Sequence, residues 1–130
     1  METIIDCQVH AESQISPSES HKKVLKAMLN ILPDCEYRTT HNTVQVHSKN
    51  IMDLDTIRKS MLSRQLSNSL RKSLLRNADD TSTWLFLNRQ AAFVGIAAIC
   101  EEADESPLGP IKITLTSPDI QGVIEWFSHI

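Results

Sequence analysis

The apolar residues of this 130-residue chain recur with two different periods. Every second residue is apolar in residues 5–9 and 111–115, which is typical of strands that bury one face. A period near 3.6 in residues 24–32 and 120–127 predicts helices with one apolar side. Such a helix needs an apolar surface to pack against, and a sheet supplies it in two layers. The two periods together predict an α+β fold.

Turn and cap signals between these stretches give the order β-α-β-β-α-β-β-β-α. We expect strands at residues 2–10, 35–39, 43–48, 81–88, 91–100 and 111–116, with a tight turn near His41-Asn42. The apolar stretch 91–100 contains Gly95, which suggests a bulge or a close approach of the backbone. This order predicts one domain, 1–130, built as a two-layer sandwich. Its sheet is mixed or antiparallel, with the helices on one face.

Three helices complete the pattern. Ser16 fits an N-cap with Pro17 at the first helical position and Glu19 closing a capping box, and Pro33-Asp34 ends that helix. The second is a single long helix that opens at Asp53 or Asp55 and runs to Arg76. It carries an i, i+4 stripe of Leu62, Leu66, Leu70 and Leu74. Ser117-Pro118-Asp119 caps the third helix.

Charge is distributed unevenly along the chain. The net charge is −3, but residues 57–76 contain six basic side chains and no acid, which leaves −9 for the rest. The six are Arg58, Lys59, Arg64, Arg71, Lys72 and Arg76. Cations along one helix face could lie against phosphates and release counterions. The alternative is a solvated outer face.

Asn88-Arg89-Gln90 is a polar triplet between two apolar stretches that we expect to be strands. Arginine and amide side chains can contact base edges or the backbone of single-stranded RNA. The same groups can instead satisfy buried carbonyls where a strand bends. Both interpretations stay open at the level of sequence.

Three stretches of the chain resemble one family. Residues 86–95 (FLNRQAAFVG) resemble the signature LNKQAA-x-VG of uncharacterised protein family 0201, small archaeal proteins that carry a predicted RNA-binding label. Residues 106–111 (SPLGPI) resemble its SPLGPI box. Residues 16–19 (SPSE), followed by Val24 and residues 30–33 (NILP), are similar to its PTE…V…NIFP segment.

The resemblance implies a two-layer fold similar to that of the large-subunit ribosomal protein that binds 5S rRNA, together with the RNA-binding label. The chain departs from the family pattern at three positions. Arg89 stands where the family has Lys, Ser18 where it has Thr, and Ser20 where it tends to have an acid. The first change keeps a cation but alters its geometry.

Chemistry-bearing residues do not group in a way that indicates catalysis. Cys7, Cys35 and Cys100 are an odd number without a CxxC pair, so we expect small apolar fillers rather than a disulfide framework or a zinc site. The five histidines are scattered, and no cofactor or metal is expected. The N-terminus does not resemble a signal peptide, and no apolar run is long enough to span a bilayer. These features favour a cytoplasmic protein that is not an enzyme.

Two functions follow as hypotheses. The first is a non-catalytic RNA-binding module for structured or ribosomal RNA, in which the acidic residues 101–105 would repel phosphate. The second is a protein-interaction or assembly module. It would dock a basic partner, or form a homodimer by placing the basic helix of one copy against the acidic loop of another.

Overall fold

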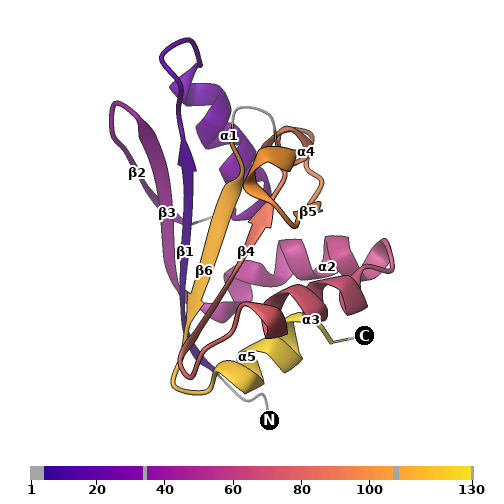
Figure 1. Cartoon of the computed structure of the whole chain (residues 1–130). Helices are drawn as coiled ribbons and strands as arrows, with labels where there is room; N and C mark the ends of the chain where they lie inside the picture. Colours follow the sequence, from indigo (N-terminus) through magenta and orange to yellow (C-terminus); the bar gives the residue numbers. More distant parts are fainter. Residues whose placement is uncertain (1–4, 34, 107–108, 130) are drawn as a thin grey trace.

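The chain folds around one antiparallel sheet (Figure 1). The computed structural model describes residues 5–33, 35–106 and 109–129. The strands are β1 (Asp6–Gln14), β2 (Glu36–Thr39), β3 (Thr43–Asn50), β4 (Ser82–Leu87), β5 (Ile99–Cys100) and β6 (Ile111–Thr116). Their order is β2-β3-β1-β6-β4-β5, and every neighbouring pair runs antiparallel.

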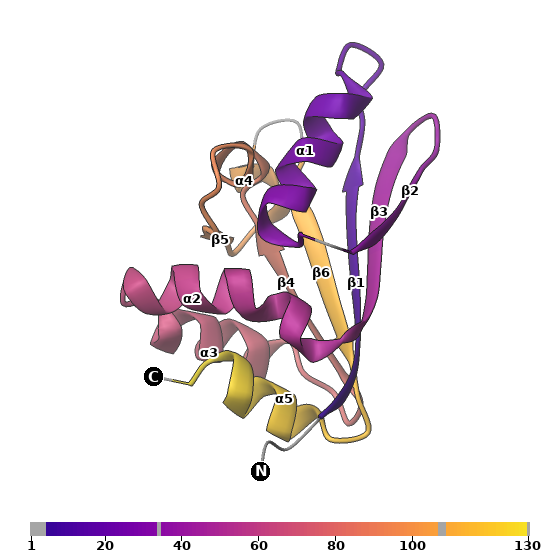
Figure 2. The same cartoon turned by 180° about the vertical axis from the view of Figure 1, so that it is seen from behind.

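The helices cover one face of this sheet. They are α1 (His21–Ile31), α2 (Asp55–Ser63), α3 (Ser67–Arg76), α4 (Arg89–Phe93) and α5 (Ile120–Phe127), with 3₁₀ turns at Ile51–Leu54 and Ala103–Glu105. Figure 2 shows α1, α2, α3 and α5 in front of the strands, whereas Figure 1, from the opposite side, shows the strands in front. The predicted two-layer α+β fold, with an antiparallel sheet and helices on one face, is confirmed.

Alternation along the strands sorts their side chains into two layers. On β1, Val9 and Ala11 are buried, while their neighbours His10 and Glu12 are not. The same pattern holds on β3, β4 and β6. The buried set meets apolar side chains of the helices, among them Met28, Ile57, Leu70 and Phe127, in a hydrophobic core. One face of the sheet is therefore covered, and the other is left to solvent.

The expected long second helix is wrong, because the chain breaks into α2 and α3 at Gln65. Gln65 has φ of 59°, in the left-handed region. Its N–H donates to the Leu62 carbonyl at 3.1 Å, and the N–H of Leu66 donates to the Met61 carbonyl at 2.8 Å. These two bonds form a Schellman motif, which ends α2 without a glycine. The break leaves Leu62 exposed, so the predicted leucine stripe is not one continuous surface.

The prediction of a strand over residues 91–100 is also wrong for most of its length. The side-chain oxygen of Asn88 accepts from the Ala91 N–H at 2.8 Å and opens the short helix α4. Gly95, with φ of 82°, then lies in a turn, and only Ile99–Cys100 pairs with β4. The apolar residues of this stretch serve a helix, a turn and an edge strand in succession.

Several predicted helices and strands are present but begin or end at residues other than those expected. The first helix begins after Ser20, whose Oγ accepts from the Lys23 N–H at 3.4 Å, rather than after Ser16. The predicted stop at Pro33-Asp34 falls partly outside the described residues. Residues 2–4 of the predicted first strand and Pro107-Leu108 of the SPLGPI box lie entirely outside the described residues. The hairpin at His41-Asn42 and the cap at Asp119 are confirmed.

None of the helices in the described ranges combines the length and the apolarity that spanning a membrane requires.

Candidate nucleic-acid interface

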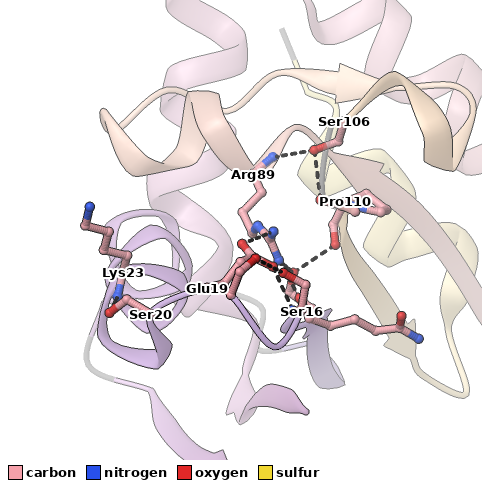
Figure 3. Close-up of polar contacts among 11 residues, drawn as sticks. Ser16, Glu19, Ser20, Lys23, Arg89, Ser106 and Pro110 are labelled. Atoms are coloured by element: carbon pink, nitrogen blue, oxygen red, sulfur yellow. Dashed lines mark hydrogen bonds and ion pairs between the residues drawn. The ribbon is translucent and has the colours of Figure 1, made fainter.

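The stretches that carry the family resemblance meet around the Arg89 side chain (Figure 3). Its Nη2 pairs with Oε2 of Glu19 at 2.5 Å. Its Nη1 donates to Oγ of Ser13 at 2.9 Å and to the carbonyl of Gln14. The Arg89 backbone N–H donates to Oγ of Ser106 at 3.2 Å. One guanidinium therefore joins the turn before α1, strand β1 and the helix α4, and the backbone amide of Arg89 adds the loop before β6.

Arg89 and Glu19 form an ion pair that is nearly closed to solvent. The Arg89 side chain is 6% exposed and that of Glu19 is 12% exposed. Burial alone would raise the pKa of the Glu19 carboxyl, but the hydrogen bond from the Ser16 N–H and the Arg89 charge outweigh it, so that pKa is lowered. Glu19 is thus held as a carboxylate. Arg89 was expected among the RNA-binding residues, and the structure instead places its guanidinium in the interior, bonded to Glu19, Ser13 and Gln14.

The two amides of the predicted triplet have different environments. Asn88 is the N-cap of α4, so its side-chain oxygen is already occupied. Gln90 is exposed and lines a small hollow beside Arg89. At the C-terminal end of α4, Nδ2 of Asn30 donates to the carbonyls of Ala92 at 3.1 Å and Phe93 at 3.0 Å. The interpretation in which this motif satisfies carbonyls at a bend therefore fits Arg89, which donates to the Gln14 carbonyl, whereas Asn88 accepts from a backbone N–H.

The six predicted cations fall into two groups, each with members from α2 or its C-cap and from α3. In the first group, Arg58 and Arg71 contact the α5 segment, and Lys59 lies beside Asp55 on α2. Nε of Arg58 donates to the Trp126 carbonyl at 3.0 Å, and its guanidinium lies 5.3 Å from the centroid of the Trp126 ring. Nε of Arg71 donates to Oγ of Ser128 at 3.1 Å, and its Nη2 pairs with Glu125 at 3.3 Å. Lys59 pairs with Asp55 at 3.0 Å. Each of these three cations is therefore paired with a carboxylate of the chain itself, Asp55 for Arg58 and Lys59 and Glu125 for Arg71.

The second group consists of Arg64, Lys72 and Arg76, which lie on the side of α3 near residues 98–101. Nη1 of Arg64 donates to the Ala97 carbonyl at 2.8 Å, which directs it toward β5. The ion pairs within the described ranges include none of these three cations. The expectation of one continuous cationic helix face is therefore wrong, because the helix breaks at Gln65 and two of the six cations, Arg58 and Arg71, pack against the α5 segment.

The uncovered face of the sheet brings together residues that lie far apart in the sequence. Side chains paired across an antiparallel ladder point the same way. One row across five strands is Arg38, Gln45, Glu12, Lys112 and Phe86. The next row is Glu36, His47, His10, Thr114 and Trp84. We call these ten residues the open face.

Aromatic rings gather at the β4 end of the open face. The centroids of Trp84 and Phe86 lie 5.0 Å apart, with the rings inclined at 59°. Nζ of Lys112 lies 5.0 Å from the centroid of the Trp84 ring. In the row that contains Trp84, the ring centroids of His10 and His47 lie 6.5 Å apart. Both Trp84 and Phe86 are half-buried, so part of each ring system remains accessible to a planar ligand.

A hollow of about 660 Å³ adjoins this aromatic end. Phe86 and Lys112 form part of its wall, and Glu12 and Asp104 bring carboxylates to it. The rest of the lining comes from Gln14, Ala103, Ser106, Gly109 and Pro110. Its size is in the range of ligand pockets, so an unstacked base could enter beside the Phe86 ring.

Formal charge on the open face is balanced. Arg38 and Lys112 are the cations, and Glu12 and Glu36 are the acids. Such a surface does not attract polyanions strongly at long range. Ring stacking, rather than counterion release, would have to supply most of its affinity for a nucleic acid.

Sequence reasoning missed the open face as a site. The signal was present, because Trp84 and Phe86 alternate with the buried Thr83, Leu85 and Leu87. That alternation shows that two aromatic rings turn away from the core. It does not show which strands lie beside them, and that information decides the site.

The described residues contain no group of three or more His, Cys, Asp or Glu side chains that could hold a metal ion. Cys7 and Cys100 are buried. Burial, reinforced by the nearby Asp6 charge, raises the pKa of the Cys7 thiol to about 11.

Fold and surface define an α+β protein whose antiparallel sheet has one face covered by helices and one face open. A family model described as RNA binding matches residues 8–117, and the chain belongs to that family, whose curated members are UPF0201 proteins of archaea. A UPF0201 protein of Sulfurisphaera tokodaii is 31% identical over 121 residues, which cover 90% of this chain and 83% of that protein. One from Methanothermobacter thermautotrophicus is 29% identical and covers 93% and 90%.

Solved structures of the same family share the fold. One UPF0201 protein aligns with a TM-score of 0.74 at 28% identity, covering 86% of this chain and 84% of that chain. The UPF0201 protein of Methanococcus jannaschii aligns with a TM-score of 0.80 at 22% identity, covering 93% and 98%.

Proposed function

We propose that this protein is a non-catalytic RNA-binding module of the cytoplasm, and that it binds single-stranded segments of structured RNA on the open face. The observation that carries the proposal is the Trp84–Phe86 ring pair, with Lys112 beside it, on the uncovered side of the sheet. Sheets that present aromatic rings in this way bind RNA by stacking two or three unpaired bases. The description of the family agrees with this assignment.

The proposal differs from the one that the charge pattern suggested. The basic residues of α2 and α3 are divided, and three of the six are paired with carboxylates. The open face has only two cations for phosphates, Arg38 and Lys112. Two contacts predict a shallow salt dependence, with log K falling by about 1.4 per decade of salt. A duplex should bind more weakly than a single strand, because its bases are already stacked.

Tryptophan fluorescence tests the proposal directly. The chain has two tryptophans, so Trp126→Phe leaves Trp84 as the sole indole reporter. Titration with a single-stranded oligoribonucleotide of about eight nucleotides should quench it, since ring stacking involves Trp84 itself. Phe86→Ala should weaken binding roughly tenfold, the effect of losing one stacked base.

Phe93→Ala is the matched control. Phe93 is also accessible, but it lies on α4 beside Lys26, away from the open face. Its loss should leave RNA affinity unchanged. No quenching of Trp84 at low salt, or equal effects of the two substitutions, would overturn the proposal.

A further inference from the structure

A second hollow lies between α3 and the edge strand β5. Its volume is about 480 Å³, and residues from the α2–α3 turn, from α3 and from residues 98–101 line it. The lining consists of Arg64, Leu66, Ser69, Lys72, Ser73, Arg76, Ala98, Ile99 and Glu101. None of these residues belongs to the open face, so this hollow is a separate feature of the molecule.

The hollow collects the second group of cations. Arg64, Lys72 and Arg76 all line it, against one carboxylate, that of Glu101. The ion pairs of the described part of the chain include none of the three cations. Arg64 is fixed in place, because one of its donors is bonded to the Ala97 carbonyl at 2.8 Å. A guanidinium has five N–H donors, so the others remain for a ligand.

The remaining lining adds two further features. Leu66, Ala98 and Ile99 provide apolar surface, and Ser69 and Ser73 bring hydroxyl groups from α3. Lys72 and Arg76 are four residues apart on that helix, so their side chains extend from the same side. The hollow thus combines an apolar wall that suits a ring with cations that suit an anion.

We propose that this hollow binds a phosphorylated small molecule of the nucleoside diphosphate type. Its phosphates would lie among Arg64, Lys72 and Arg76, and its base or sugar would pack on Leu66 and Ile99. The neighbouring acidic side chains would repel a long polyanion. Glu101 is followed by Glu102, Asp104 and Glu105, so an RNA strand that continued past the cations would meet four carboxylates. A compact ligand avoids them.

Calorimetric titration of the full chain with ADP tests this proposal, with inorganic phosphate, adenosine and a single-stranded oligoribonucleotide as comparison ligands. ADP should bind, and adenosine and phosphate should each bind at least roughly tenfold more weakly, because each has half of the contacts. Lys72→Gln and Arg76→Gln should each weaken ADP binding roughly tenfold, as expected for loss of a charged hydrogen bond. Both side chains are exposed, so neither substitution should disturb folding.

Lys59→Gln is the control, since it removes an exposed cation outside the hollow. Trp84→Ala should leave ADP binding intact, which separates this site from the open face. Three results would overturn the proposal. They are absence of ADP binding at millimolar concentration, unchanged affinity in the Lys72 and Arg76 variants, and phosphate or the oligoribonucleotide competing as well as ADP itself. The last result would mean that the cations bind phosphate groups without recognising the small molecule.

Discussion

Replacing Arg89 by methionine should destabilise the protein by about 3 kcal/mol, as expected when a buried ion pair loses one partner. Methionine keeps the length and the apolar stem of the side chain and removes its charge. The Glu19 carboxylate, 12% exposed, would keep the Ser16 N–H at 2.9 Å but lose its counter-ion. The hydroxyl of Ser13 and the carbonyl of Gln14 would each lose a donor as well.

The magnitude follows from the geometry. Breaking a buried ion pair from one side typically costs 3–5 kcal/mol, and the residual exposure of Glu19 places this pair at the lower end, about 3 kcal/mol. For a chain of this size that loss lowers Tm by about 12 °C. Urea unfolding followed by circular dichroism should show a lower midpoint with an unchanged slope.

Two further variants make the test specific. Arg76→Met removes an exposed arginine outside the ion pairs of the described residues, and it should change stability by less than about 0.5 kcal/mol. Adding Glu19→Gln to Arg89→Met should cost less than the sum of the two single changes, because both remove the same contact. A loss below about 1 kcal/mol for Arg89→Met, or additive effects in the double variant, would refute the role assigned to this pair.

Three more predictions concern stability and reactivity. Because the folded pKa of Glu19 is lowered, its ionisation stabilises the fold above the unfolded value of about 4.3, and this stabilisation is lost as pH falls through the folded pKa. Glu19→Gln should therefore be more destabilising at pH 7 than at pH 3, and an equal urea-midpoint gap at both would contradict this. Gln65→Gly should stabilise the protein by up to about 1 kcal/mol, because glycine adopts the left-handed backbone conformation without strain. The control Ser69→Gly, within α3, should destabilise the protein by about 0.5 kcal/mol. Lower stability of the Gln65→Gly variant would contradict the Schellman assignment. Burial raises the pKa of the Cys7 thiol to about 11, so Cys7 should react with a disulfide reagent at pH 8 only on unfolding. The partly exposed Cys35 should react in the folded state. Labelling of Cys7 in the folded protein, detected by mass spectrometry, would contradict this.

Much of the fold was predictable because its elements carry local signals. Alternation in residues 111–115 and the cap at Asp119 depend on neighbours in the sequence, and both predicted elements are present. The helix break at Gln65 has no such signal. Residues 64–66 contain neither glycine nor proline, and the left-handed turn is held by Leu66 packing against the core. A helix-period pattern on both sides therefore predicted one helix.

The short helix α4 escaped prediction for a related reason. Five residues are too few to show a helical period, although Ala91 and Ala92 themselves favour a helix. Asn88 was a usable cap signal, but the neighbouring Arg89 and Gln90 suggested a binding motif instead. The buried partners of Arg89 lie about 70 residues earlier in the chain, so only the fold could show that this motif is internal.

The candidate site was the least predictable feature. Trp84 and His10 share a row of the sheet because β6 lies between β4 and β1, an order that no local pattern specifies. The similarity to the ribosomal protein that binds 5S rRNA, and the homodimer, stay predictions. Light scattering would show whether two copies associate.

Nuclear magnetic resonance provides the most direct test of the RNA proposal. Uniformly ¹⁵N-labelled protein would be titrated with the same single-stranded oligoribonucleotide used for fluorescence. We expect the indole N–H of Trp84 and the amides of β1, β4 and β6 to shift, while the amides of α2 and α3 stay in place. Shifts confined to α2 and α3, or none at millimolar RNA, would contradict binding on the open face.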